Sequence, residues 1–246
     1  MSTVPLILED VEMGGKEDDG IEDDFAYRNN VMHASVKIRL GFIRKVYSLV
    51  FMQLLVTTII GFTLMFWQNG RSFVHENDWL LMVAFFGSMV TLIALHIKRK
   101  DTPTNYILLS IFTVVQAYSV GVVVTFFEGI VVLQALLLTV TVLGGLTLYT
   151  FQTKRDFSSL GVFLFAGLCV LLVAGIIRIF FINTVFEIII SVFGALLFSL
   201  FIVYDTQNIM QRVSPEEYII ATIELYLDIL NLFLYILRAL DATRRG

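Results

Sequence analysis

Two aspartates stand inside apolar stretches near the end of the chain, where an ionised side chain is costly. Asp205 follows the apolar run 196–204, and Asp228 interrupts the apolar run 218–240. A carboxylate at the centre of a membrane helix costs about 2.5–3.5 kcal/mol on insertion scales. Such residues normally face a bundle interior or a water-filled cavity and mark ion or proton pathways. The two aspartates therefore predict a membrane protein that handles cations or protons.

The chemistry of the two side chains depends on whether they meet. Two carboxylates that approach each other cannot both ionise cheaply, so the pair holds a proton and titrates in coupled steps. A shared proton would lock their segments together, whereas the deprotonated oxygens repel each other or attract a hard cation such as Ca²⁺. Asp205 and Asp228 are thus the predicted ion and proton sensor pair and the candidate Ca²⁺ contacts. A lower pH should favour the locked state.

Long charge-free segments supply the membrane helices that would carry these residues. The chain is 57% hydrophobic and 15% charged, with a mean hydropathy of +0.83. A span needs about 20 apolar residues, with a usual range of roughly 17–25. Six runs qualify, and a seventh at 218–240 has the length but contains polar residues; the six are 46–70, 79–95, 102–127, 129–153, 157–177 and 188–204. The pattern predicts an all-α membrane protein, a seven-helix transmembrane bundle with the seventh helix at its centre.

Polar residues of the seventh segment share one helical face. Glu224, Asp228, Asn231 and Tyr235 follow one another at steps of four, three and four residues, a spacing that places them on one side of a helix. This stripe makes Glu224 and Asn231 secondary pore candidates beside the aspartate pair. Glu224 also fits a simpler role, as a carboxylate near the helix end that reaches water.

The sixth segment carries an acidic residue toward each membrane surface. Glu187 and Asp205 are 18 residues apart, which is five helical turns and about 27 Å along one face. Small residues and then aromatic ones lie between them on this face: Ser191, Gly194, Phe198 and Phe201. The arrangement predicts a closed conduit with acidic mouths, whose hydrophobic middle gates by dewetting. For Glu187 an ion pair with Arg178 across the short connecting turn is an equally good interpretation.

The charge distribution divides the chain into three parts. Residues 1–24 contain nine acidic residues and one lysine, so this leader should be disordered. We assign 1–45 to an acidic disordered cytosolic leader and pre-membrane segment, 46–240 to the transmembrane bundle, and 241–246 to a short tail.

Basic residues set the expected orientation of the bundle. They gather before the first run and in the connections after the second, fourth and sixth runs, which predicts a cytosolic amino terminus. Arg244 and Arg245 would then lie on the opposite side if the seventh segment spans fully. The long apolar flanks of Asp228 nevertheless favour a complete span. Ser214, Pro215 and Glu217 predict its start as an N-cap, a first-turn proline and a capping box.

Other functional classes find little support in the sequence. Glycine-rich phosphate loops are absent, and the three histidines His33, His75 and His96 are too scattered for a metal cluster. We therefore expect no enzyme, no nucleic-acid partner and no cofactor, with Ca²⁺ and H⁺ as permeant or bound ions and lipid as the surroundings. A proton-coupled cation exchanger using the same carboxylates, and a non-conducting interaction protein acting through the acidic leader, stay open as alternatives.

Short motifs around the two aspartates are similar to those of a known family. YDTQ at 204–207, SPEEY at 214–218 and LYLDILNLF at 225–233 resemble the Bax-inhibitor (transmembrane Bax inhibitor motif) family. IEDDF at 21–25, FIRKVY at 42–47 and FVHE at 73–76 resemble its Lifeguard branch. The resemblance covers nearly the whole chain apart from its first twenty residues.

The resemblance implies a seven-helix bundle whose last helix is enclosed by the others. It further implies a pH-sensitive Ca²⁺ leak from Golgi or endoplasmic reticulum stores, with the two aspartates as sensor, and inhibition of apoptosis together with apoptosis-regulating membrane proteins. Bacterial relatives latch the pair with an arginine on the second helix, whereas the second run here has only His96, Lys98 and Arg99 at its end. Intramembrane aspartyl proteases also pair aspartates, but the Gly-x-Gly-Asp expected there is replaced by LYLD at 225–228.

Overall fold

The computed structural model describes residues 36–245, apart from residues 78, 154 and 182. Most of the predicted acidic leader therefore lies outside the described residues. Within the described part the chain is helical and forms no strand. Its helices are α2 (Val36–Phe66), α3 (Gln68–Glu76), α4 (Trp79–Lys98), α5 (Thr104–Val124), α6 (Gly129–Gln152), α7 (Leu160–Phe180), α8 (Thr184–Gln211), the 3-10 turn η1 (Pro215–Glu217) and α9 (Tyr218–Arg245).

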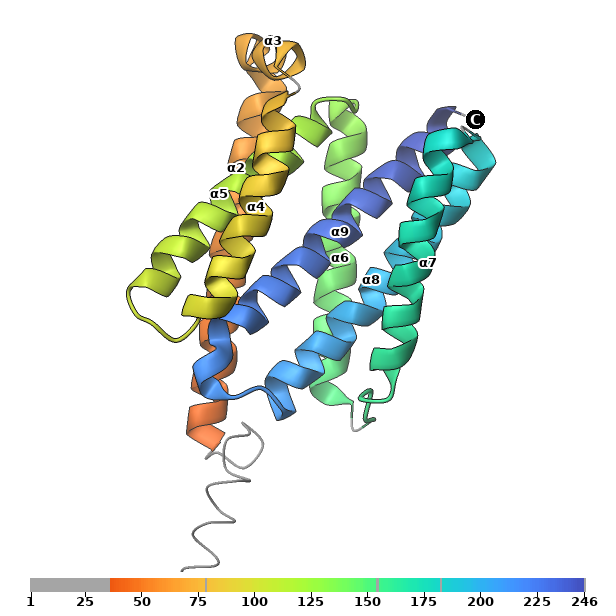
Figure 1. The fold of residues 1–246 in the computed structure, drawn as a ribbon. Coiled ribbons are helices and arrows are strands. Elements are labelled where there is room, and N and C mark those ends of the chain that lie inside the picture. Colours follow the sequence, from red (N-terminus) through yellow and green to blue (C-terminus); the bar gives the residue numbers. More distant parts are fainter. Residues whose placement is uncertain (1–35, 78, 154, 182, 246) are drawn as a thin grey trace, which may run out of the picture.

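The helices form a membrane bundle around α9, as the sequence predicts (Figure 1). Seven of the described helices are long and apolar enough to cross a membrane. In α9, 61% of the most apolar window is buried, against at most 44% in any other span. Helices α2, α6 and α8 pack most closely on α9, while α4 packs on α5 and α7 on α8. The polar seventh segment is thus a full helix enclosed by the other spans.

The two ends of the bundle are named here by the chain termini. The amino-terminal face is the end where α2 begins, and it carries the α4–α5, α6–α7 and α8–α9 connections (Figure 1). The carboxy-terminal face is the opposite end, where α9 finishes and α3 lies. Because α9 runs from one face to the other, Arg244 reaches the carboxy-terminal face, where it lies 2.7 Å from Glu128. Residues 241–245, predicted as a tail, continue α9.

Many hydroxyl groups inside the spans are satisfied within their own helix. The side chain of Thr113 donates to the carbonyl of Leu109 over 2.7 Å, and Thr139 donates to Ala135 over 2.7 Å. In lipid every polar group needs a partner within the protein, and a bond to the carbonyl four residues earlier is available to any helical threonine. The spans can therefore contain many threonines and serines at little cost.

Two local predictions at helix ends are corrected by the structure. The first apolar run continues to residue 70, but α2 ends at Phe66 and the short helix α3 follows. At the start of α9, Ser214 caps the 3-10 turn by accepting from the backbone N–H of Glu216. Glu217 does not complete the predicted capping box, because its carboxylate pairs with Arg99 over 3.1 Å.

Ion pairs tie the connections of the amino-terminal face together. Lys100 lies 2.9 Å from Glu216, beside the Arg99 pair, so the α4–α5 connection holds the start of α9. The backbone N–H of Ser158 donates to Asp156 and lowers the pKa of that carboxyl group. Asp156 thus stays ionised at neutral pH, 3.5 Å from Arg212 at the end of α8.

Candidate functional site

The structure places Asp205 and Asp228 against each other at the interface between α8 and α9. Asp205 lies six residues before the end of α8, and Asp228 lies ten residues after the start of α9. The two antiparallel helices make the most extensive helix contact in the described chain. Their carboxyl groups are close enough to interact with each other. The two helices therefore bring these two acidic residues together.

Burial leaves one oxygen of this pair without a partner. Asp228 is 7% exposed, and its Oδ2 accepts no hydrogen bond from the described residues. Asp205 is half-buried. Buried polar atoms without partners are rare in folded proteins, because no hydrogen bond then offsets the free-energy cost of removing the atom from water. A proton or a cation at this oxygen would relieve that cost.

The charged groups closest to the pair are acidic. Glu224, one turn before Asp228 on α9, is close enough for its charge to act on both aspartates. Its side chain is exposed at the surface of the bundle. Among the described residues, no group of three or more histidine, cysteine or acidic side chains could hold a metal ion. The site therefore consists of a pair of aspartates with a third acidic residue nearby.

The basic residues at the end of α4 are held away from the pair. Arg99 pairs with Glu217, and Lys98 lies 2.8 Å from Asp101, while His96 is exposed at the outer surface. These contacts engage the residues that stand nearest in the sequence to the expected arginine latch. Within the described residues, it is the packing of α8 on α9 that brings Asp205 and Asp228 together.

Hydroxyl groups beside the aspartates were missed by the sequence argument. The Tyr47 hydroxyl of α2 lies 3.0 Å from the Thr206 hydroxyl, directly after Asp205. The Tyr226 hydroxyl, two residues before Asp228, lies 2.7 Å from the Thr57 hydroxyl of α2. Each bond joins α2 to one of the two helices of the pair. A tyrosine close to an ionisable residue inside an apolar run was the feature of the sequence that could have indicated these hydroxyl groups.

A buried chain of hydrogen bonds continues from Tyr226 toward α5. Thr57 donates to the carbonyl of Gln53 over 2.8 Å, and the Gln53 amide donates to Thr113 over 2.9 Å. The Gln53 amide thus joins α2 to α5. We expect Tyr226→Phe to lower the free energy of unfolding by about 0.5–1.5 kcal/mol, the worth of one hydrogen bond. Thermal unfolding in detergent would measure this, and an equal loss in Tyr149→Phe, at an exposed tyrosine of α6, would contradict it.

Aromatic side chains of α8 and α9 pack together between the levels of Asp205 and Glu187, the acidic residues near the two ends of α8. The rings of Phe198 and Tyr235 stack with centroids 5.6 Å apart, and Phe198 stacks on Phe201 at 5.7 Å. Gly194 provides the room, since a Cβ there would lie 2.5 Å from the Tyr235 ring. We call Phe198, Phe201 and Tyr235 the aromatic block. Asn231 lies between the block and Asp228 in the α9 sequence, and its amide donates to the carbonyl of Leu227 in the same helix.

Glu187 is engaged in an ion pair at the carboxy-terminal face. Its carboxylate lies 2.5 Å from the Arg178 guanidinium, which agrees with the interfacial interpretation of this residue. Arg238 of α9 is close enough for both charges to act on it. The two acidic ends of α8 therefore differ: Asp205 faces another acid, whereas Glu187 is neutralised by an arginine.

Comparisons with known proteins identify relatives over most of the chain. A family model described as "Inhibitor of apoptosis-promoting Bax1" matches residues 39–245. The mouse protein lifeguard 4 is 47% identical over 225 residues, covering 92% of this chain and 94% of the relative. The Golgi anti-apoptotic protein of vaccinia virus (strain Lister) is 43% identical, covering 92% and 95%. Bax inhibitor 1 of Schizosaccharomyces pombe is 38% identical, covering 89% and 82%. The chain therefore belongs to the Bax inhibitor family.

Proposed function

We propose that this protein is a pH-sensitive calcium leak pathway of intracellular membranes, which lowers store calcium and inhibits apoptosis. The observation that carries the proposal is the meeting of Asp205 and Asp228 inside the bundle, with Oδ2 of Asp228 unpartnered among the described residues. Carboxylate oxygens are preferred ligands of Ca²⁺. The pair would therefore contact the ion when deprotonated and exclude it when it holds a proton.

The aromatic block supports a closed state in the proposed pathway. Phe198 is 6% exposed and stacks on Tyr235, on the side of the pair that faces the carboxy-terminal face. A hydrophobic constriction of this kind prevents ion passage by excluding water. Opening would require α8 and α9 to separate at the block. Repulsion between the deprotonated aspartates would supply part of that separation.

The proposed location follows the relatives and the charge pattern. The vaccinia relative is named a Golgi anti-apoptotic protein, so we place this chain in the Golgi membrane, the endoplasmic reticulum, or both. Basic residues gather at the amino-terminal face, as Lys98, Arg99, Lys100 and Arg212 illustrate. By the positive-inside rule this face is cytosolic. The aspartate pair then lies toward the cytosol, and the Arg178–Glu187 pair toward the lumen.

Calcium flux into liposomes containing the purified protein tests the proposal. Flux should be low at pH 6 and higher at pH 8, because protonation locks the pair and deprotonation releases it. Asp205→Asn and Asp228→Asn should each flatten this dependence, since one amide abolishes the shared titration. Asp101→Asn, at an exposed acid that pairs with Lys98, should leave it unchanged.

Other outcomes of the same experiment distinguish the competing functions. Calcium uptake driven by an imposed proton gradient would indicate an exchanger that uses the same carboxylates. If the purified protein passes no calcium at any pH, the leak proposal fails. Loss of cell protection on deletion of residues 1–24, with flux unaffected, would instead favour a non-conducting role for the acidic leader.

A further inference from the structure

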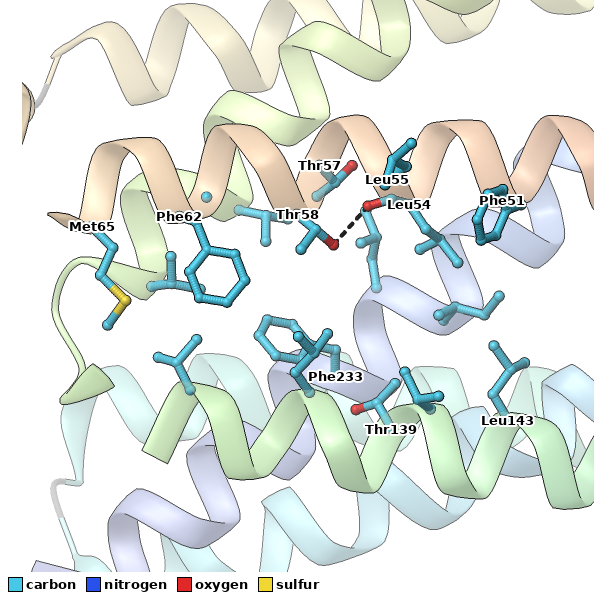
Figure 2. A pocket seen from close by; sticks show the side chains of 18 residues that line it. Phe51, Leu54, Leu55, Thr57, Thr58, Phe62, Met65, Thr139, Leu143 and Phe233 are labelled. Atoms are coloured by element: carbon cyan, nitrogen blue, oxygen red, sulfur yellow. Dashed lines mark hydrogen bonds between the residues drawn. The ribbon is translucent and has the colours of Figure 1, made fainter. Parts of the chain in front are cut away.

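A cavity separate from the aspartate pair lies between α2, α5, α6 and α9. Its volume is about 380 Å³, within the range of about 300–1,000 Å³ that is usual for ligand pockets. Helices α2 and α6 both pack on α9, yet they are not among the closely packed helix pairs of the bundle. In Figure 2 the side chains of α2 and α6 face each other across the cavity, and Phe233 of α9 is one of its lining residues. The separation of α2 from α6 creates this space.

The cavity opens sideways through the outer surface of the bundle. Its rim includes Phe51, Leu55 and Val140, which are 64%, 43% and 58% exposed. Its floor includes Ile229 and Phe233, which are 4% and 8% exposed. In a membrane, a surface of this kind at this depth faces hydrocarbon rather than water. A molecule dissolved in the bilayer can therefore enter between α2 and α6.

The lining offers no free hydrogen-bond donor to a ligand. Its side-chain polar atoms are the hydroxyls of Thr57, Thr58 and Thr139. Each of them donates to a carbonyl of its own helix, over 2.7–2.8 Å. Figure 2 draws the bond from Thr58 as a dashed line. The acceptor groups of a polar ligand would stay unpaired at this site, and the rest of the lining is apolar, so the lining favours a hydrocarbon occupant.

The position of the cavity points to one leaflet of the bilayer. Along α2 the lining runs from Phe51 to Met65, which is about 21 Å at 1.5 Å per residue. These residues belong to the half of α2 nearest the carboxy-terminal face, and Val132, near the start of α6, and Val124, at the end of α5, lie at the same end. One leaflet of the hydrocarbon core is about 15 Å deep. The lining is thus about 6 Å longer than one leaflet, and an acyl chain that enters from that leaflet and lies along the helices can fill most of it.

We propose that this cavity is a binding site for one acyl chain of a phospholipid from the leaflet at the carboxy-terminal face. The chain enters between α2 and α6 and packs on Ile229, Leu230 and Phe233 of α9. The lipid headgroup stays outside the cavity, at the membrane surface. Leu230 comes two residues after Asp228, so the occupant contacts the same helix that carries the sensor residue.

Photochemical labelling can test this site in the full-length protein. The purified chain would be placed in vesicles containing phosphatidylcholine with a diazirine midway along one acyl chain. After irradiation, mass spectrometry should find lipid adducts on Ile229, Leu230 or Phe233. Surrounding lipid cannot reach these buried residues unless a chain enters the cavity. Native protein without adducts on any of them would overturn the proposal.

Two neighbouring leucines of α6 provide a matched pair of variants. Leu136 lines the cavity and is half-buried, whereas Leu137 is 61% exposed and does not line it. Leu136→Trp fills the cavity and should reduce the floor adducts several-fold, while Leu137→Trp should leave them unchanged. If Leu136→Trp does not fold, Leu143→Phe tests the same loss from two turns further along α6.

The remaining outcomes decide the identity of the occupant. Floor adducts that persist at full yield in the filled variants would show that the label reaches α9 by another route, and would overturn the proposal. A sterol carrying a diazirine that labels the floor, where the phospholipid probe does not, would also overturn it and assign the cavity to a sterol. Labelling by the phospholipid probe, with competition by unlabelled phosphatidylcholine, would support it.

Discussion

Tyr235→Ala is expected to raise calcium flux at pH 6 by about tenfold or more. Each loss of about 1.4 kcal/mol from the stability of the closed state raises the ratio of open to closed protein tenfold. The Tyr235 ring stacks on Phe198 and fills the space beside Gly194. Aromatic pairs contribute about 0.5–1.5 kcal/mol beyond the area they bury, and truncation also removes the bulk that excludes water from the constriction. The closed state loses both contributions, whereas an open state with separated helices loses neither.

The comparison that isolates the constriction uses an aromatic residue outside it. Phe165→Ala removes a ring of α7 that is 69% exposed, so flux should stay at the native level at every pH. Asp205 and Asp228 are intact in Tyr235→Ala, so a residual pH dependence should persist on a raised baseline. Flux in Tyr235→Ala that is indistinguishable from the native protein would remove the aromatic block from the proposed gate.

Much of the architecture could be predicted because hydrophobic length is a strong constraint in lipid. Backbone groups must be satisfied within each span, so seven apolar segments leave little choice other than seven helices. The central position of α9 could also be inferred, since Asp228 and its polar neighbours need shelter from lipid. The boundary between α2 and α3 was harder to place: Trp67, Gln68 and Asn69 continue a charge-free segment, although the chain turns there.

The sequence predicted several residues of the candidate site, but not their contacts across the helices. Spacing along α8 and α9 places residues on faces, but it does not say which faces meet across an interface. The close packing of the Tyr235 ring on Gly194 depends on the register of α8 and α9. The bond from Tyr226 to Thr57 depends on how α2 crosses α9. These contacts join residues distant in the sequence, so no local pattern reveals them.

The cavity between α2 and α6 could not be predicted from local sequence patterns either. Its lining residues, such as Thr58 and Leu136, have the ordinary composition of any membrane helix. The space exists because α2 and α6 both pack on α9 but do not pack closely on each other. Crossing geometry of this kind follows from the whole set of helix contacts, which hydropathy does not encode.

Gly194→Ala is expected to destabilise the protein by about 1 kcal/mol or more, although alanine is the better helix former. The added Cβ would lie 2.5 and 2.6 Å from two atoms of the Tyr235 ring, and overpacking typically costs about 1–3 kcal/mol. The gain in helix propensity is at most about 1 kcal/mol. Gly144→Ala supplies the control, because a Cβ there meets no heavy atom within 4 Å. Thermal unfolding should therefore shift downward for Gly194→Ala, and upward or not at all for Gly144→Ala.

A double-mutant cycle decides whether the clash with Tyr235 is the cause. If it is, Gly194→Ala should cost much less in the Tyr235→Ala background than in the native protein, giving a coupling within about 0.5–3 kcal/mol. Additive effects would show that Gly194 matters for another reason, such as backbone approach between α8 and α9. The same clash should push the Tyr235 ring away from Phe198 and raise calcium flux at pH 6. Stability and conduction would then respond together to a single methyl group, as expected if the helix interface that holds the fold closed is also the gate.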